Sequence, residues 1–303
     1  MSRKRIIYNV LGAASNNGTI PAIQSMTYDF ALPYQNVTEY GNLGIKDQVI
    51  NGQPTINLNL NYLLNNIDNE SKIGFSSSTD TLDNILNDNY SLNFTGFIGK
   101  EGFDLSDNKI EALIVFKSGY LTSYSAKAGV GELMSINATF SCNDLVFQST
   151  SNASYNNLIP TGFSQPPTCE GNSLSLNINS IGIATGDFKI QNFDLNLSIN
   201  RSPQILFGEK LARYQYINYP IDVTLNAEVI VGDYQNDTIS SIVSNGRQLN
   251  LIIGTPFKTY EIGNCKLISQ NFNTSIGQNE TANLSFKSTL GGANDNLNYF
   301  RIT

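Results

Sequence analysis

Residues 26–32 read Met-Thr-Tyr-Asp-Phe-Ala-Leu, and residues 193–199 read Phe-Asp-Leu-Asn-Leu-Ser-Ile. In both stretches the apolar side chains occupy alternate positions, which is the pattern of a β-strand with one buried face. The two stretches lie 167 positions apart along the chain, at 26 and 193. This pair of similar strands indicates that the chain contains one domain twice.

Further matches follow in the same order, and their spacing shrinks in two steps. At a spacing of 167 the matches are Tyr40-Gly41 with Phe207-Gly208, Ile50-Asn51 with Ile217-Asn218, and Leu58-Asn59 with Leu225-Asn226. At 157 they are Asp80-Thr81-Leu82 with Asp237-Thr238-Ile239, and Leu92-Asn93 with Leu249-Asn250. At 146 they are Leu121, Gly131 and Phe140 with Leu267, Gly277 and Phe286. We therefore predict a duplicated domain whose first copy has 10 and 11 additional residues, near 65–79 and 97–110.

The length of the chain agrees with two copies of one domain. Its 303 residues divide into two parts of roughly 150 residues each, a common domain size. A stretch rich in Ser and Asn, followed by prolines at 160, 166 and 167, separates the copies. We predict a first β domain over residues 1–148, a linker over 149–170 and a second β domain over 171–303.

The alternating pattern extends over most of the chain and predicts short strands joined by turns. Asn, Ser and Thr recur at the polar positions, as in Leu58-Asn59-Leu60-Asn61, which predicts an uncharged polar sheet face. One segment per copy has helical spacing instead, with apolar residues at 82, 85 and 86 and at 239, 242 and 243. Asp80 and Asp237, or the Thr after each, are suitable N-caps. The predicted fold class is mainly β, with two tandem β-sandwich or barrel-like domains, each with one short α-helix and a long inter-strand loop.

The long loop occurs in both copies, as Pro33–Gln53 and Asn200–Pro220. A connection of about 20 residues is too long for a simple turn, and such loops commonly carry function or contacts. We predict that the two loops form contacts between subunits or between rings of subunits. The candidate residues are Pro33, Tyr34, Tyr40, Gly41, Arg201, Phe207, Gly208, Tyr214 and Tyr216.

Residue types that most catalytic chemistry needs are missing. The chain has no histidine, which excludes Ser-His-Asp and Cys-His catalysis and His-ligated metals. It also lacks a glycine-rich phosphate-binding motif. Its three cysteines, Cys142, Cys169 and Cys265, lack metal-ligand spacing. Paired carboxylates such as Asp104 with Asp107 are the remaining option for acid–base chemistry, but this pair lies in turn-like sequence. We expect no enzymatic activity, no cofactor and no bound metal.

Charge and terminal sequence restrict the partners further. The chain has 25 acidic and 18 basic residues, a net charge of −7, which argues against sequence-independent binding to nucleic acid. The apolar stretch Ile6–Val10 is too short for a signal peptide or a membrane span. We therefore expect no membrane partner. Three cysteines, an odd number, make a disulfide framework improbable. This favours assembly in a reducing compartment.

One order of elements appears twice. The first copy has Ile23-Gln24-Ser25 at the start of a strand, the loop with Tyr40-Gly41, a strand at Ile56 and the helical segment at Asp80, and the second copy starts with Ile190-Gln191-Asn192 and repeats this order. This arrangement resembles the tail-tube (major tail) proteins of long-tailed bacteriophages. In that family a β-sandwich carries one helix and a long loop, and six domains close into a ring. The rings stack into the tube through which DNA passes.

The resemblance implies a virion structural protein of the phage tail, assembled in the cytoplasm of the host bacterium. Because the chain is duplicated, it resembles the tube proteins with two fused domains, which form trimeric rings with pseudo-six-fold symmetry. Its implied partners are other copies of itself, other tail proteins, and genomic DNA that passes through the lumen without specific binding.

Two alternatives stay open. A tandem β-sandwich could bind a receptor or carbohydrate through aromatic residues at its loop tips. The chain could also be another ring component of the tail, such as a terminator or a hub protein. A specific hit on a glycan array would favour the first alternative, and copy number per particle would separate a tube protein from the second.

Overall fold

The computed structural model covers the whole chain. It describes residues 8–41, 44–76, 81–100, 110–149, 168–170, 173–180, 187–209, 211–230, 249–273, 281–291 and 299–303. The predicted helix at Asp237, the Asp104–Asp107 pair and most of the predicted linker lie outside these residues.

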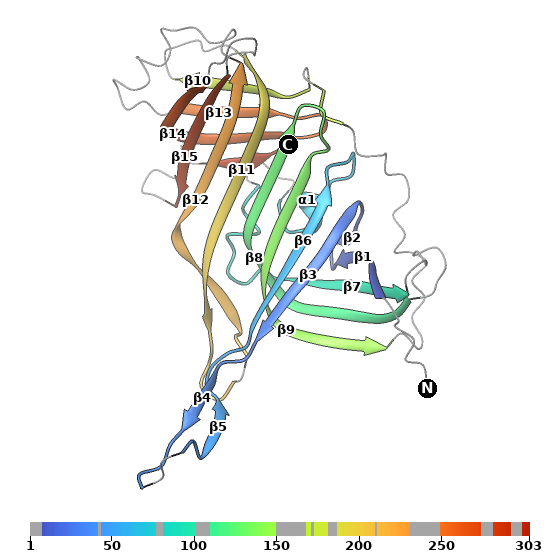
Figure 1. The fold of residues 1–303 in the computed structure, drawn as a ribbon, viewed down its shortest axis with the longest axis vertical. Coiled ribbons are helices and arrows are strands. Elements are labelled where there is room, and N and C mark those ends of the chain that lie inside the picture. The colour runs from blue at the N-terminus through green and yellow to red at the C-terminus, as the bar shows by residue number, and fades with distance from the viewer. Residues whose placement is uncertain are drawn as a thin grey trace.

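The described residues form a mainly β protein with one short helix (Figure 1). The first copy contains β1 (Tyr8–Ser15), β2 (Gly18–Ile20), β3 (Ile23–Ala31), β4 (Tyr34–Val37), β5 (Asp47–Ile50), β6 (Thr55–Leu63), α1 (Asn69–Lys72), β7 (Leu92–Lys100), β8 (Ile110–Gly129) and β9 (Ser135–Ser149). The second copy contains β10 (Ser175–Ser180), β11 (Asp187–Gln204), β12 (Tyr214–Ile230), β13 (Leu249–Gly254), β14 (Thr259–Asn273), β15 (Thr281–Leu290) and β16 (Phe300–Ile302).

A continuous antiparallel sheet runs through both copies. The first copy contributes β3, β6, β9 and β8 in that order, and the second contributes β11, β12, β15 and β14. The two groups of four strands join where β8 pairs with β11. In the second copy, β10 pairs with both β13 and β11, which closes a six-stranded barrel.

The two copies have the same pairing registers, at the spacings found in the sequence. Ile56 lies opposite Cys142 in the first copy, and Val223 lies opposite Ser288 in the second. β-Bulges also recur, between Ile23/Ser25 and Ile190/Asn192, and between Leu121/Ser123 and Leu267/Ser269. Bulges locally bend a strand and mark specific positions in a fold. The two copies therefore share backbone details as well as hydrophobic pattern.

A matching left-handed residue inside β8 and inside β14 shows how local chemistry is repeated. Ser118 and Asn264 both have positive φ angles, 51° and 53°. The backbone N–H of Ser118 donates to Oδ1 of Asn93 at 3.0 Å, and that of Asn264 donates to Oδ1 of Asn250 at 3.2 Å. Left-handed backbone is unfavourable for residues other than glycine, and an asparagine side chain supports it in both copies.

Alternation along the strands separates an apolar core from a polar face, as predicted. Leu58, Leu60 and Tyr62 on β6 are fully buried. The asparagines between them, Asn57, Asn59 and Asn61, are partly exposed on the other face. We call this second face the polar face. On it, Lys127 pairs with Asp194 at 2.8 Å and Lys287 pairs with Asp222 at 3.0 Å.

The helix of the first copy lies earlier than predicted. Residues 81–86 form a run of turns, with one helical hydrogen bond from the N–H of Leu86 to the oxygen of Leu82 at 2.8 Å. Leu82 and Ile85 are buried, as the apolar spacing predicts. The helix α1 occupies 69–72, inside the first predicted insertion. No helix in the described residues is long and apolar enough to cross a membrane.

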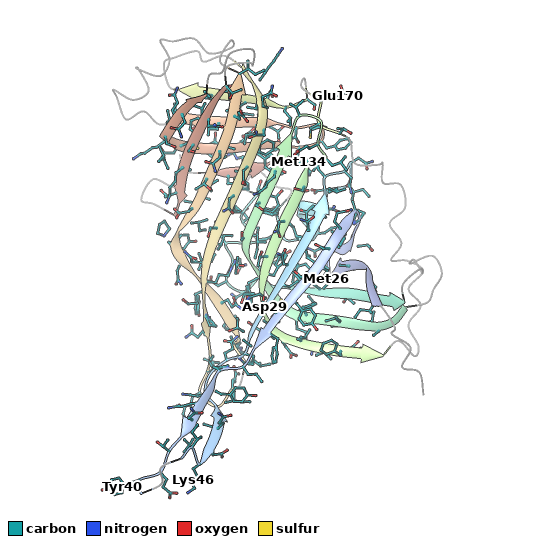
Figure 2. The ribbon with its side chains drawn as sticks, viewed as in Figure 1. Met26, Asp29, Tyr40, Lys46, Met134 and Glu170 are labelled. Atoms are coloured by element: carbon teal, nitrogen blue, oxygen red, sulfur yellow. The ribbon has the colours of Figure 1, made fainter. Side chains whose placement is uncertain are left out.

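The two long loops extend from one end of the sheet, and we call them arm 1 (33–53) and arm 2 (200–220). Arm 1 contains the separate hairpin β4–β5, in which Tyr34 pairs with Ile50. Arm 2 is a continuation of β11 and β12, which stay paired as far as Gln204 and Tyr214. Figure 2 shows Tyr40 at the far end of arm 1, remote from Met134 at the opposite end of the molecule.

Candidate assembly interface

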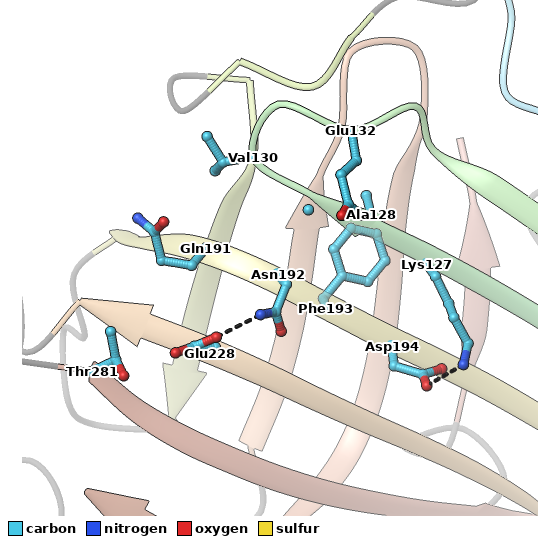
Figure 3. Close-up of a pocket in the computed structure, with 11 residues that line it drawn as sticks. Lys127, Ala128, Val130, Glu132, Gln191, Asn192, Phe193, Asp194, Glu228 and Thr281 are labelled. Carbon is cyan, nitrogen blue, oxygen red and sulfur yellow. Dashed lines mark hydrogen bonds and ion pairs between the residues drawn. The ribbon is translucent and has the colours of Figure 1, made fainter. Parts of the chain in front are cut away.

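The two copies meet along a seam between β8 and β11. Residues 123–129 pair with residues 192–198 in antiparallel register, so that Ser125 lies opposite Asn196. The ion pair between Lys127 and Asp194 crosses the seam (Figure 3). We call this the internal seam. It shows how one copy of the domain associates with the next.

The buried side of the internal seam joins the two cores. Phe193, Leu195 and Leu197 of β11 are almost completely buried, as are Tyr124 and Ala126 of β8. Burial of a large apolar side chain contributes about 1.5–3 kcal/mol. Hydrophobic burial therefore stabilises the seam in addition to its backbone hydrogen bonds.

Arg201, at the base of arm 2, holds the second copy against the first. Its guanidinium donates to the backbone oxygens of Leu121 at 2.9 Å, Ile85 at 2.7 Å and Gln215 at 3.1 Å. It also lies over the ring of Tyr120, 5.3 Å from the centroid. Burial lowers the pKa of Arg201 to about 10, partly opposed by Asp88, so the side chain stays charged at neutral pH.

A second polar contact fixes arm 2 on β9. The side-chain amide of Gln215 donates to Oδ1 of Asn143 at 2.8 Å, and Nδ2 of Asn143 donates to the oxygen of Ala212 at 2.8 Å. Both side chains are buried. Buried amides are costly unless their hydrogen bonds are made. The arm of the second copy is therefore held specifically against the first copy.

A buried carboxylate lies between the copies at α1. Oε1 of Glu70 accepts from the hydroxyls of Tyr62 at 3.2 Å and Tyr124 at 3.3 Å, and Tyr124 is 3.1 Å from the hydroxyl of Tyr260. Lys258 of the second copy lies 3.6 Å from Oε2 of Glu70. Burial raises the pKa of Glu70, and the charge of Lys258 offsets this in part. This cluster connects the first insertion to the second copy.

The two ends of the continuous sheet are single-paired strands. Among the described residues, β3 pairs only with β6, and residues 266–273 of β14 pair only with β15. These edges are the repeat counterparts of the two strands of the internal seam. β3 corresponds to β11 at a spacing of 167, and β14 corresponds to β8 at a spacing of 146. Unpaired edges readily pair with another chain.

Burial differs strongly between the matched strands β3 and β11. Tyr28 and Phe30 of β3 are 42% and 50% exposed, while their counterparts Leu195 and Leu197 are 0% exposed. The positions are equivalent in the repeat, but only those on β11 are covered, because β8 of the first copy pairs with β11. Tyr28 makes edge contacts with Phe116 and Phe147, at 5.6 and 6.4 Å between ring centroids, but much of the aromatic side of β3 stays exposed.

The arms carry a second group of exposed apolar residues. Tyr40 and Phe207 occupy equivalent positions and are fully exposed, at 106% and 108%. Each is followed by a glycine with positive φ, 86° at Gly41 and 88° at Gly208. An apolar depression of about 630 Å³ lies between the arms. Its lining residues are Leu32, Ile50, Gly52, Pro54, Ile205, Glu209 and Leu211. Apolar residues that are exposed together on a surface are candidates for an interaction site.

The predicted site residues fall into two groups. Arg201 lies at the base of arm 2, where it contacts the first copy of the same chain, and the half-buried Tyr214 lies farther along the arm, opposite Gln204. The others lie at exposed or half-buried positions of the arms and are Pro33, Tyr34, Tyr40, Gly41, Phe207, Gly208 and Tyr216. The internal seam and the Glu70 cluster were not predicted, although the strand match at 26 and 193 identified one strand of the seam.

A depression at the opposite end of the internal seam is more polar. It has a volume of about 570 Å³, and Asn192, Glu228, Lys127 and Asp194 lie on its wall (Figure 3). Asn192 donates to Glu228, and Lys127 pairs with Asp194, so these polar groups satisfy one another. Within the described ranges, no group of three or more His, Cys, Asp or Glu residues is placed to hold a metal ion.

Comparison with known proteins gives similarity to solved structures, but not to family models or curated sequences. No family model and no curated protein sequence matches the chain. Among solved structures, the chain is similar to a chain of the cryo-EM structure of the anti-feeding prophage (AFP) baseplate, six-fold symmetrised. The identity is 14% and the TM-score is 0.34, over 46% of this chain and 97% of that chain.

Proposed function

We propose that this chain is a structural subunit of a phage-type tail, in which three copies form a ring and the rings stack into a tube. The carrying observation is the pair of single-paired edges, β3 and β14, which correspond to the two strands of the internal seam. A chain whose two ends repeat its own internal contact can add further copies head to tail. Such an interface either closes into a ring or grows without limit.

The number of chains in the ring comes from the sequence resemblance. Three chains of two domains give the six domains of the tail-tube family. If every step between neighbouring domains repeats the geometry of the internal seam, the ring has three-fold chemical symmetry and nearly six-fold shape. Closure also covers the two exposed edges of the continuous sheet, β3 and residues 266–273 of β14, and covering of edges is a common way for β proteins to avoid uncontrolled aggregation.

The polar face supports a lumen through which DNA slides. Its strands present Asn, Ser and Thr, and the lysines at 127 and 287 are each paired with an aspartate, whereas the exposed Lys266 lies opposite Lys287. Affinity for DNA comes mainly from unpaired Lys and Arg that neutralise phosphates. A face of this composition offers a polyanion little to hold it, as a conduit requires.

Electron microscopy of the purified protein at high concentration tests the proposal. Class averages viewed down the axis should show rings with three-fold symmetry and six similar lobes, and side views should show stacked rings. A protein that stays monomeric, even with an initiating tail complex present, contradicts the proposal. One ring per particle would instead identify a terminator or hub component.

A further inference from the structure

We propose that β14 of one chain pairs with β3 of the next chain in the antiparallel register of the internal seam, with Asn271 opposite Asp29. The inference rests on the proposed function, because it names the surface through which the ring closes.

The edge strands of the two copies are structurally equivalent. In both copies the strand order is the same, β3-β6-β9-β8 and β11-β12-β15-β14. The bulges next to the edges recur at Ile23/Ser25 and Ile190/Asn192. They recur again at Leu121/Ser123 and Leu267/Ser269. The edge strands of the two copies therefore have the same local bends and the same inward and outward positions.

The internal seam defines the register expected for β14 and β3. In the internal seam Ser125 lies opposite Asn196, and Ser123 lies opposite Ser198. The β14 counterparts lie 146 positions after the β8 residues, and the β3 counterparts lie 167 positions before the β11 residues. Replacing each residue by its counterpart gives the pairing between chains. It places Asn271 opposite Asp29, and Ser269 opposite Ala31. A slip of one residue would move the aromatic side of β3 to the polar face, so the hydrophobic pattern opposes it.

The pairing would cover side chains that are exposed in the single chain. Tyr28 and Phe30 are exposed on β3, and the transferred register brings Phe30 opposite Gln270, the counterpart of Tyr124. On the other side of the strands, Asp29 and Asn271 are both exposed. This side carries polar groups that stay in contact with solvent, as Asn196 does at the internal seam. The polar side of the new seam would thus match that of the internal seam, while its covered side has Gln270 in place of the buried Tyr124.

Cysteine cross-linking tests the register directly. Residues directly opposite in an antiparallel pair have Cα atoms about 4.5–5.5 Å apart, which is within the range of a disulfide. The variant D29C/N271C should form intermolecular disulfides, seen as dimers and closed trimers on a non-reducing gel. The matched control S125C/N196C should form the equivalent disulfide within one chain. The native cysteines 142, 169 and 265 are free and buried, so they do not compete.

An off-register variant sharpens the test. D29C/S269C displaces the pairing by two residues, to a diagonal separation of about 7–8 Å, and should cross-link at least about tenfold less than D29C/N271C. Rings in the microscope without the D29C/N271C link, or with the off-register link instead, overturn the proposed register. Absence of the link at high concentration, where the internal control is oxidised, also overturns it. Linked chains that never form rings uphold the pairing and contradict the tube function.

Discussion

Glu70 is the residue whose environment is least expected in a chain dominated by neutral polar side chains. Its carboxylate is 3% exposed and lies among Tyr62, Tyr124 and Lys258. Desolvation of a carboxylate raises its pKa, because the charged form loses its hydration. Lys258 is shared with Asp68, which is closer, at 2.7 Å. The cluster therefore fixes the contact between the copies, but the desolvated Glu70 carboxylate lowers the free energy of unfolding near neutral pH.

The pH dependence of the free energy of unfolding should reveal this destabilisation by Glu70. A raised pKa means that the folded protein holds the Glu70 proton at pH values where the unfolded chain releases it. The contribution of Glu70 to folding stability is therefore fully present below pH 4.5, the ordinary pKa of a glutamate. It is lost as the pH rises through the higher pKa of the folded state. Glu70→Gln keeps the shape and removes the titration, so its stability relative to the native protein should increase from pH 4.5 to neutrality. The gain is about 1.4 kcal/mol per unit of pKa shift.

Asp68→Asn is the matched control with the opposite sign. Burial alone would raise the pKa of Asp68, but the hydrogen bond and charge of Lys258 outweigh it and lower the pKa. The contribution of Asp68 to folding stability is present above pH 3.8, the ordinary pKa of an aspartate, and is lost on acidification. The variant should therefore be less stable than the native protein at neutral pH. Chemical denaturation across this pH range gives both curves. Parallel curves for Glu70→Gln and the native protein would contradict the assignment.

The sequence could not predict these residue-level contacts, because the partners are far apart along the chain. Arg201 reaches oxygens 80 and 116 positions away. Lys258 reaches Asp68 across 190 positions. A lone charged residue in a loop has many possible partners, and the folded chain selects among them. Arg201 was singled out as a contact residue from its place in a conspicuous long loop, without its partner in the first copy.

At the scale of elements, the repeat was predictable and the helix was not. Strand registers follow from alternating side chains, and two similar patterns support each other. The segment 81–86 has helical apolar spacing, yet tertiary hydrogen bonds use part of its polar groups. The backbone oxygen of Ile85 accepts a hydrogen bond from Arg201, and the hydroxyl of Thr81 accepts one from the N–H of Ile302. Short segments of this kind take the backbone that their neighbours impose, because an isolated helix this short is unstable.

The arms make a separate prediction about stacking. Tyr40 and Phe207 are fully exposed and lie at equivalent tips. We expect the double variant Tyr40→Ser and Phe207→Ser to keep its unfolding temperature, since neither side chain is covered by the chain itself. Rings should still form, but tubes should become shorter or absent when viewed by electron microscopy. Phe257→Ser, an exposed aromatic outside the arms, is the control. Tubes of normal length from the tip variant would exclude the tips from stacking.

At the scale of the whole molecule, the internal seam and the proposed seam between chains differ in their anchors. The counterparts of Arg201 and Tyr120 are Tyr34 and Lys266, and the counterpart of Tyr124 is Gln270. The seam between chains thus lacks the buried arginine, its stacking partner and one member of the tyrosine cluster. Its strand pairing can be the same while its stability is lower. Such a difference keeps each chain intact while it leaves assembly dependent on concentration or on an initiating surface.

Restoring the missing anchor should therefore strengthen assembly. The double variant Tyr34→Arg and Lys266→Tyr recreates the stacked pair, and the oxygen of Leu267 is the counterpart of the Leu121 acceptor. A charge-assisted hydrogen bond contributes about 1.5–3 kcal/mol, so the concentration at which rings form should fall about tenfold or more. Sedimentation against concentration measures this shift, and Lys266→Tyr alone is the control that lacks the cation. The reverse change, Arg201→Tyr with Tyr120→Lys, should instead destabilise the folded monomer. An unchanged assembly concentration would mean that the two seams are not equivalent, because equivalent seams must respond to the same anchor.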